Sequence, residues 1–114
     1  TSSLLSSSGH VALSVLASLA ECASSLTKAG HQVILVSSGA VGLGCQRMGL
    51  TSKPDTIAKK QALAAIGQMR LMRHYEDIFD ALGCKCAQVL LTYDNLNSRD
   101  QFINARNTLR ELLR

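Results

Sequence analysis

The fold that this sequence predicts is decided by the stretch QVILVSSGA at residues 32–40. Residues 32–36 form a largely β-branched, apolar run without polar alternation, which is typical of a strand buried on both faces, as in a parallel sheet. The small residues SSGA follow at once, and the three glycines of residues 41–50 predict a short, irregular helix. The stretch therefore predicts a buried strand that leads through a tight turn into a helix.

Helical patterns lie on both sides of this stretch. Apolar residues recur at a spacing of about 3.6 residues over residues 10–29, and Gly30 supplies a C-terminal stop. A long helix is predicted over residues 55–82, with Asp55 as its N-cap and Gly83 beyond its end. Its first half is rich in small residues that permit close packing, against the core or another subunit. Its second half carries an apolar stripe of Leu71, Met72, Tyr75, Ile78, Phe79 and Leu82.

A second strand–turn–helix pattern closes the chain. Residues 87–92 read as another buried strand, and residues 94–97 as a polar turn. Ser98, followed three residues later by Gln101, predicts a capping box that opens a final helix. The order helix, strand, helix, helix, strand, helix predicts an α/β class, a three-layer α/β/α sandwich with a mainly parallel sheet. Two strands make an incomplete sheet, so we expect residues 1–114 to be part of a larger domain.

Composition narrows the function classes. Hydrophobic residues make up 46% of the 114 residues and charged residues 18%, which predicts a packed core. The net charge of +4 is scattered along the chain, and aromatic residues make up 4%, so we expect no nucleic-acid partner. No apolar run approaches the roughly 20 residues that span a bilayer, so we expect no membrane partner.

Cysteine and histidine spacing predicts no metal site. The four cysteines match no zinc pattern, and we expect buried, unreactive thiols in a reducing compartment. The three histidines, His10, His31 and His74, are isolated in sequence, which is typical of structural or exposed side chains.

Two loops are candidate sites by position, because ligands of open α/β sheets bind beyond the carboxyl ends of strands. The better candidate is Ser38, Gly39 and Ala40, since Gly39 permits close backbone approach and helix N-terminal amides favour carboxylate or phosphate. A helix-capping turn explains the same residues equally well. The second loop is residues 92–95. Thr1 and Ser2 are candidates for a phosphate loop, although hydroxyls at a chain start are commonly plain loop.

Four segments in order resemble one family. They are VILVSSGAV (33–41), KQALAAIGQ (60–68), AQVLLT (87–92) and NARNTL (104–109). Together they are similar to the glutamate 5-kinases of the amino acid kinase superfamily, over essentially the whole chain. The resemblance implies ATP- and Mg²⁺-dependent phosphorylation of the γ-carboxylate of L-glutamate, the first step of proline biosynthesis, in the cytoplasm. It also implies glutamate binding at Ser38, beside Gly39 and Ala40, feedback inhibition by L-proline close by, and a homo-oligomer, dimer or tetramer.

The resemblance also implies functional groups outside this chain. The family's lysine lies upstream of Thr1, and its Asn-Glu-Asn-Asp loop and nucleotide-binding half lie beyond Arg114. We therefore expect residues 1–114 to be the glutamate-binding N-terminal part of an amino acid kinase domain, without catalytic residues or a metal site. We expect this piece alone to be inactive, because phosphoryl transfer needs cations around the developing charge.

Other interpretations remain open. One is the kinase domain of a bifunctional pyrroline-5-carboxylate synthase, although the short connection over residues 51–60 lacks the insertion typical of that relative. Another is a non-catalytic module that binds an amino acid with the same loop. A dinucleotide-binding half-domain is disfavoured, because Gly42 and Gly44 are followed by Arg47 where a third glycine belongs.

Overall fold

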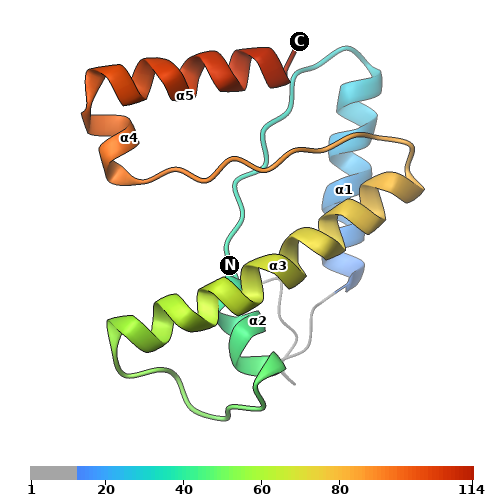
Figure 1. Ribbon diagram of the computed structural model, residues 1–114. Coiled ribbons are helices and arrows are strands. Elements are labelled where there is room, and N and C mark those ends of the chain that lie inside the picture. The colour runs from blue at the N-terminus through green and yellow to red at the C-terminus, as the bar shows by residue number, and fades with distance from the viewer. Residues whose placement is uncertain (1–12) are drawn as a thin grey trace.

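The computed structural model describes residues 13–114 and contains five helices in that range (Figure 1). The third is the longest, and the fourth is a single short turn that leads directly into the fifth. Among the described residues there is no β-strand. The helices are α1 Leu13–Lys28, α2 Ala40–Arg47, α3 Ile57–Ala81, α4 Tyr93–Asn97 and α5 Arg99–Leu112.

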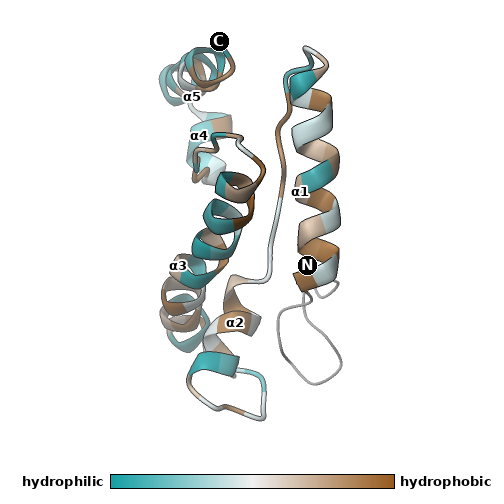
Figure 2. Ribbon diagram, turned by 90° about the vertical axis from the view of Figure 1, so that its right-hand side faces the viewer, coloured by the Kyte–Doolittle hydropathy of each residue, from teal (hydrophilic) through white to brown (hydrophobic). Residues whose placement is uncertain are grey.

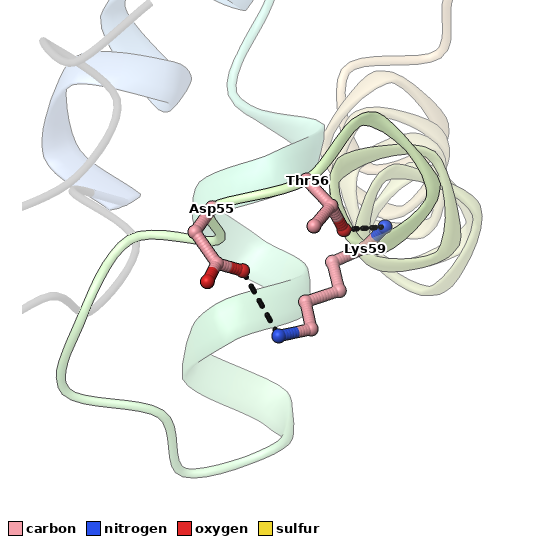
Figure 3. Close-up of polar contacts among 3 residues, drawn as sticks. All are labelled: Asp55, Thr56 and Lys59. Carbon is pink, nitrogen blue, oxygen red and sulfur yellow. Dashed lines mark hydrogen bonds and ion pairs between the residues drawn. The ribbon is translucent and has the colours of Figure 1, made fainter.

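The start of the long helix α3 differs by one residue from the prediction. Thr56, not Asp55, is the N-cap: its side-chain oxygen accepts a hydrogen bond of 3.2 Å from the backbone amide of Lys59. Asp55 instead forms an exposed ion pair of 2.9 Å with the Lys59 ammonium group (Figure 3). The prediction of Asp55 as the N-cap was wrong because threonine is also a favoured N-cap residue and Thr56 directly precedes the first helical residue, Ile57.

The capping box predicted at Ser98 is not formed, and a capping box lies instead at the start of α4. The capping box lies at Thr92 and Asn95, where the Thr92 amide donates to the Asn95 side-chain oxygen at 2.7 Å. Ser98, the predicted capping residue, is the N-cap of α5 but makes no side-chain capping bond. The predicted polar turn at residues 94–97 is instead the short helix α4, which its capping box stabilises.

Helices α2 and α3 cross at two glycines. A Cβ atom added at Gly67 would lie 1.7 Å from the Ala40 carbonyl oxygen, and one added at Gly44 would lie 1.9 Å from the Leu63 carbonyl oxygen. Both glycines are buried. Only residues without a side chain allow the two backbones to approach this closely. Gly67, one of the small residues in the first half of α3, therefore allows α2 to pack closely against α3.

A single apolar cluster joins α1, α2 and the second half of α3. It contains the predicted stripe of α3, with Leu71, Tyr75 and Phe79 buried and Met72, Ile78 and Leu82 packed against them. That prediction is confirmed. The Tyr75 and Phe79 rings stack with their centroids 6.4 Å apart. The remaining buried members of the cluster are Leu16, Ala20, Ala23 and Leu43.

The two predicted strands are extended but unpaired. Residues 32–36 and 87–92 follow extended paths without ladder hydrogen bonds among the described residues. The prediction that both are buried is wrong here: Val36 is 95% exposed and Leu90 is 72% exposed. A strand needs a neighbour to receive its amides and carbonyls, and residues 13–114 bring none beside these segments.

The extended segment after α1 lies between helices on two sides (Figure 2). Figure 2 shows α1 on one side, α3, α4 and α5 on the other, and the apolar segment leading into α2 between them. The molecule is flat, with extents of 42 × 36 × 17 Å. Its radius of gyration is 15.7 Å, against about 13 Å for a compact domain of this size. Helix α1 and the group α3, α4 and α5 therefore lie on opposite sides of the segment that leads into α2 (Figure 2).

One buried hydroxyl in α1 has no hydrogen-bond partner among the described residues. Ser24 is 3% exposed and its Oγ atom is unpaired there. A buried polar atom without a partner lowers stability. We expect Ser24→Ala to raise the free energy of unfolding by about 1 kcal/mol, measured by urea denaturation of the protein. The matched control is Ser25→Ala on the exposed face of α1. A Ser24→Ala variant no more stable than this control would contradict the prediction.

Candidate functional site

The candidate site is the turn at which the extended segment enters α2. Gly39 is the N-cap of α2, with φ of 109° and ψ of 0°. This left-handed conformation strains any residue that carries a Cβ atom, which explains the glycine. The first bond of the helix runs from the Leu43 amide to the Gly39 carbonyl oxygen at 3.0 Å. The amides of the first turn precede that bond, so they are available to a ligand.

The three predicted substrate-binding residues lie together on this turn. Ser38 is exposed, while Gly39 and Ala40 are half-buried. A hydroxyl group and helix N-terminal amides are the kinds of donor that suit a carboxylate or phosphate oxygen. Thr1 and Ser2, the predicted phosphate-loop candidates, lie outside the described residues.

A groove of about 360 Å³ begins directly after the turn, between the N-terminal half of α2 and the loop that leads to α3. It is lined by residues 41, 42, 45, 50–54 and 60. Ser38, Gly39 and Ala40 are not among its lining residues, but Val41 and Gly42 continue the same helical turn. Lys53 and Lys60 bring positive charge to the groove, a feature that the sequence interpretation had not singled out.

The turn is also tied to α3. The Tyr75 hydroxyl group donates a hydrogen bond of 2.8 Å to the Ser37 Oγ atom. The two residues stand 38 positions apart, and the sequence interpretation placed Tyr75 only in the apolar stripe. A hydroxyl-bearing tyrosine in an otherwise apolar stripe was the available signal, since a buried phenol requires a hydrogen-bond partner.

The second candidate loop, residues 92–95, belongs to a different part of the molecule. It forms the capped start of α4, where Thr92 Oγ1 donates to the Asn95 side-chain oxygen at 2.9 Å. These groups bond one another, and Tyr93 is 85% exposed. Because the polar side chains of this loop are paired with one another, the turn at Ser38 is the better supported candidate.

The thiols differ from their prediction. Cys22 and Cys86 are exposed and Cys45 and Cys84 are half-buried, so the expectation of buried thiols was wrong. Apolar side chains elsewhere fill the small core, which leaves these positions at its edge. Within residues 13–114, no group of three or more histidine, cysteine, aspartate or glutamate side chains is placed to hold a metal ion.

Partial burial, then the carboxylates of Glu76 and Asp80 and the neighbouring thiol of Cys84, raise the pKa of Cys86. Because the thiolate is the reactive form, removing one negative charge should lower that pKa and speed alkylation. We expect Glu76→Gln to increase the rate of iodoacetamide labelling at Cys86 by roughly a factor of two at pH 8. Site-specific mass spectrometry measures the rate. Asp77→Asn is the control, and an equal increase there would contradict the assignment.

The order of the helices and of the two extended segments follows the order from which the sequence predicts an α/β domain. The family model described as "Amino acid kinase family" matches residues 1–114, and the chain belongs to this family. The described residues themselves are helical, so the sheet of the family's α/β fold is not seen here.

The most similar relatives include cyanobacterial proteins named glutamate 5-kinase. The protein of Acaryochloris marina is 57% identical over 115 residues, which cover 100% of this chain and 31% of that protein. The protein of Trichormus variabilis is 58% identical over 92% of this chain and 28% of its own length. That of Nostoc punctiforme is 55% identical over 99% of this chain and 31% of its own length. The chain thus spans less than a third of the length of these relatives.

None of the helices in residues 13–114 combines the length and apolar character needed to cross a membrane.

Proposed function

We propose that this chain forms the glutamate-binding part of a kinase that transfers a phosphoryl group from ATP to L-glutamate. In this reaction a γ-carboxylate oxygen attacks the terminal phosphorus of ATP, and the bond from that phosphorus to ADP breaks. The products are glutamyl 5-phosphate and ADP. The observation that carries the proposal is 57% identity, over the whole chain, to a protein named glutamate 5-kinase. The donor turn at Ser38 gives it a physical basis.

The turn would hold a carboxylate of glutamate. The Ser38 hydroxyl group donates to one oxygen, while the Gly39 amide and the first amides of α2 face the negative charge. The positive end of the α2 dipole adds to this attraction. Because the turn is anchored to α2 and α3, it would present these donors in one fixed arrangement, which lowers the ordering cost of binding.

Residues 1–114 would form the glutamate-binding N-terminal part of an amino acid kinase domain, with the nucleotide-binding half formed by other residues. In that domain residues 32–36 and 87–92 would be strands of a mainly parallel sheet in a three-layer α/β/α sandwich. The exposed apolar side chains of both segments, and the position of the segment leading into α2 between α1 and α3 in Figure 2, support this placement. Neighbouring strands would bury the side chains and receive the free amides.

The remaining parts of the proposal follow from the family. ATP and Mg²⁺ would be the cofactors, and Mg²⁺ would neutralise charge on the phosphates. No described residue of this chain is assigned to the metal, since residues 13–114 contain no suitable cluster. Thr1 and Ser2 would contact phosphate. The protein would act in proline biosynthesis in the cytoplasm, as a homo-oligomer inhibited by L-proline, without nucleic-acid or membrane partners.

The test is an assay of the full natural protein with L-glutamate, ATP and Mg²⁺. Hydroxylamine traps an acyl phosphate as a hydroxamate, so we expect glutamate-dependent γ-glutamyl hydroxamate and an equal amount of ADP. L-Aspartate serves as the control substrate. Residues 1–114 alone should give no product. A folded, full natural protein that forms no hydroxamate from glutamate would overturn the proposal, and it would favour the non-catalytic binding module.

A further inference from the structure

The ring and the hydroxyl group of Tyr75 have different roles. The ring is 6% exposed and packs in the apolar cluster against Phe79. The hydroxyl group leaves that cluster and donates to Ser37 Oγ, one residue before the candidate binding turn. Since Ser37 is exposed, water can replace the phenol if it is removed. The hydrogen bond therefore orients the turn more than it stabilises the fold.

The hydrogen bond continues into the backbone of the turn. Ser37 Oγ accepts from Tyr75 and in turn donates to the Ser38 carbonyl oxygen, over a longer distance of 3.4 Å. That carbonyl belongs to the same peptide unit as the Gly39 amide. No peptide bond in the described residues is cis, so the carbonyl and the amide of this unit point in opposite directions. A carbonyl held toward Ser37 directs the Gly39 N–H to the opposite side.

Because residue 39 is a glycine, the direction of its N–H group depends on contacts with other residues. At φ of 109° Gly39 has access to conformations closed to other residues, so the peptide unit before it is free to rotate. The α2–α3 glycine contact fixes the helix that follows at Ala40, through the close approach of Gly67. It leaves the preceding peptide unit unconstrained. The Tyr75–Ser37 bond constrains that side of the turn.

We propose that Tyr75 is a positioning residue for the binding turn. Its hydroxyl group, acting through Ser37 and the Ser38 carbonyl, holds the Gly39 amide in the direction from which it donates to a carboxylate of the substrate. The proposal rests on the proposed function for the identity of that substrate. It adds a residue from α3, far from the turn in sequence, to the determinants of substrate affinity.

The test uses Tyr75→Phe in the full natural protein, because this substitution removes the hydroxyl group and keeps the ring. We expect the KM for glutamate to rise by roughly 2- to 10-fold, which matches the loss of one ordinary hydrogen bond. The KM for ATP, the kcat and the melting temperature should stay unchanged. Ser37→Ala should have the same effect, and the double variant should be no worse than either single one, since both remove one interaction.

The control is Thr27→Val, which removes a hydroxyl hydrogen bond of 2.9 Å to the Ala23 carbonyl on α1 and should not change the KM. A second readout is the NMR chemical shift of the Gly39 amide without substrate, which Tyr75→Phe should change because the peptide unit reorients. If the wild-type protein has no glutamate-dependent activity but this shift changes, the proposed function fails and the positioning role stands. An unchanged KM in an active Tyr75→Phe enzyme, or additive effects in the double variant, would overturn the positioning role.

Discussion

Replacing Gly67 with alanine should lower the free energy of unfolding by roughly 3 kcal/mol or more. The added Cβ atom would lie 1.7 Å from the Ala40 carbonyl oxygen and 2.6 Å from the Gly44 amide nitrogen. Both obstacles are backbone atoms, so no side-chain rotation relieves the overlap. The two helices must separate, and their shared apolar contacts with Leu43 weaken. Urea denaturation measures the change.

The matched control for this prediction is Gly83→Ala, just beyond the C-terminal end of the same helix. Gly83 has φ of 69° and nothing within 4 Å of an added Cβ atom, so alanine meets only backbone strain there. That strain costs about 1 kcal/mol. The difference between the two variants isolates the helix–helix overlap. A Gly67→Ala variant as stable as Gly83→Ala would show that α2 and α3 are not packed at this distance.

Removing the Ser38 hydroxyl group should raise the KM for glutamate by roughly 10- to 100-fold in the full natural protein. The expected loss is larger than for Tyr75 because, in the proposed function, the hydroxyl group would donate directly to a charged carboxylate, and such bonds are stronger than neutral ones. Ser38 is exposed, so Ser38→Ala should leave the unfolding free energy almost unchanged. Steady-state kinetics with glutamate as the varied substrate measures the effect.

Ser25→Ala is the control for Ser38→Ala, since it removes an exposed serine hydroxyl from α1, away from the turn. It should not alter the KM for either substrate. A Ser38→Ala enzyme that binds glutamate as the wild type does would remove the hydroxyl group from the proposed site. The Gly39 and α2 amides would then be the remaining donors at the turn.

Local patterns predicted most of the helical structure. The apolar stripe of α3 and the glycine at its end follow from spacing and conformational preference, and both appear as expected. The caps were less predictable: Asp55 and Thr56 are adjacent and are both favoured N-cap residues, and Ser98 caps α5 without the capping box that Thr92 and Asn95 form at the start of α4. Their choice depends on which residue the tertiary path places at the first turn.

Burial was predicted less well than helicity. The run at residues 32–36 is apolar on both faces, which favours a central strand, yet Val36 is 95% exposed. An apolar sequence indicates that burial of a segment would be favourable. Whether the segment is buried depends on which distant residues pack against it in the folded chain. The same limit applies to the cysteines, whose burial depends on neighbours that spacing does not identify.

The turn SSGA could be chosen as a candidate site from sequence because serine and glycine directly after a strand-like run form a local pattern. The groove beside it, with Lys53 and Lys60, could not, because those residues follow after a further helix. The Tyr75–Ser37 bond could not either, since a stripe of helical period shows which face is apolar and not which polar atom its members meet.

The order of residues alone determined the helices, their apolar faces and the strand-like runs between them, because each depends on preferences acting over a few neighbouring positions. The other features depend on residues that are far apart in the sequence. They are the close approach of Gly67 to Ala40, the Tyr75–Ser37 hydrogen bond and the exposure of the extended segments. Each depends on how distant segments pack in the folded chain. Those contacts carry no short-range pattern, so only the tertiary structure could decide them.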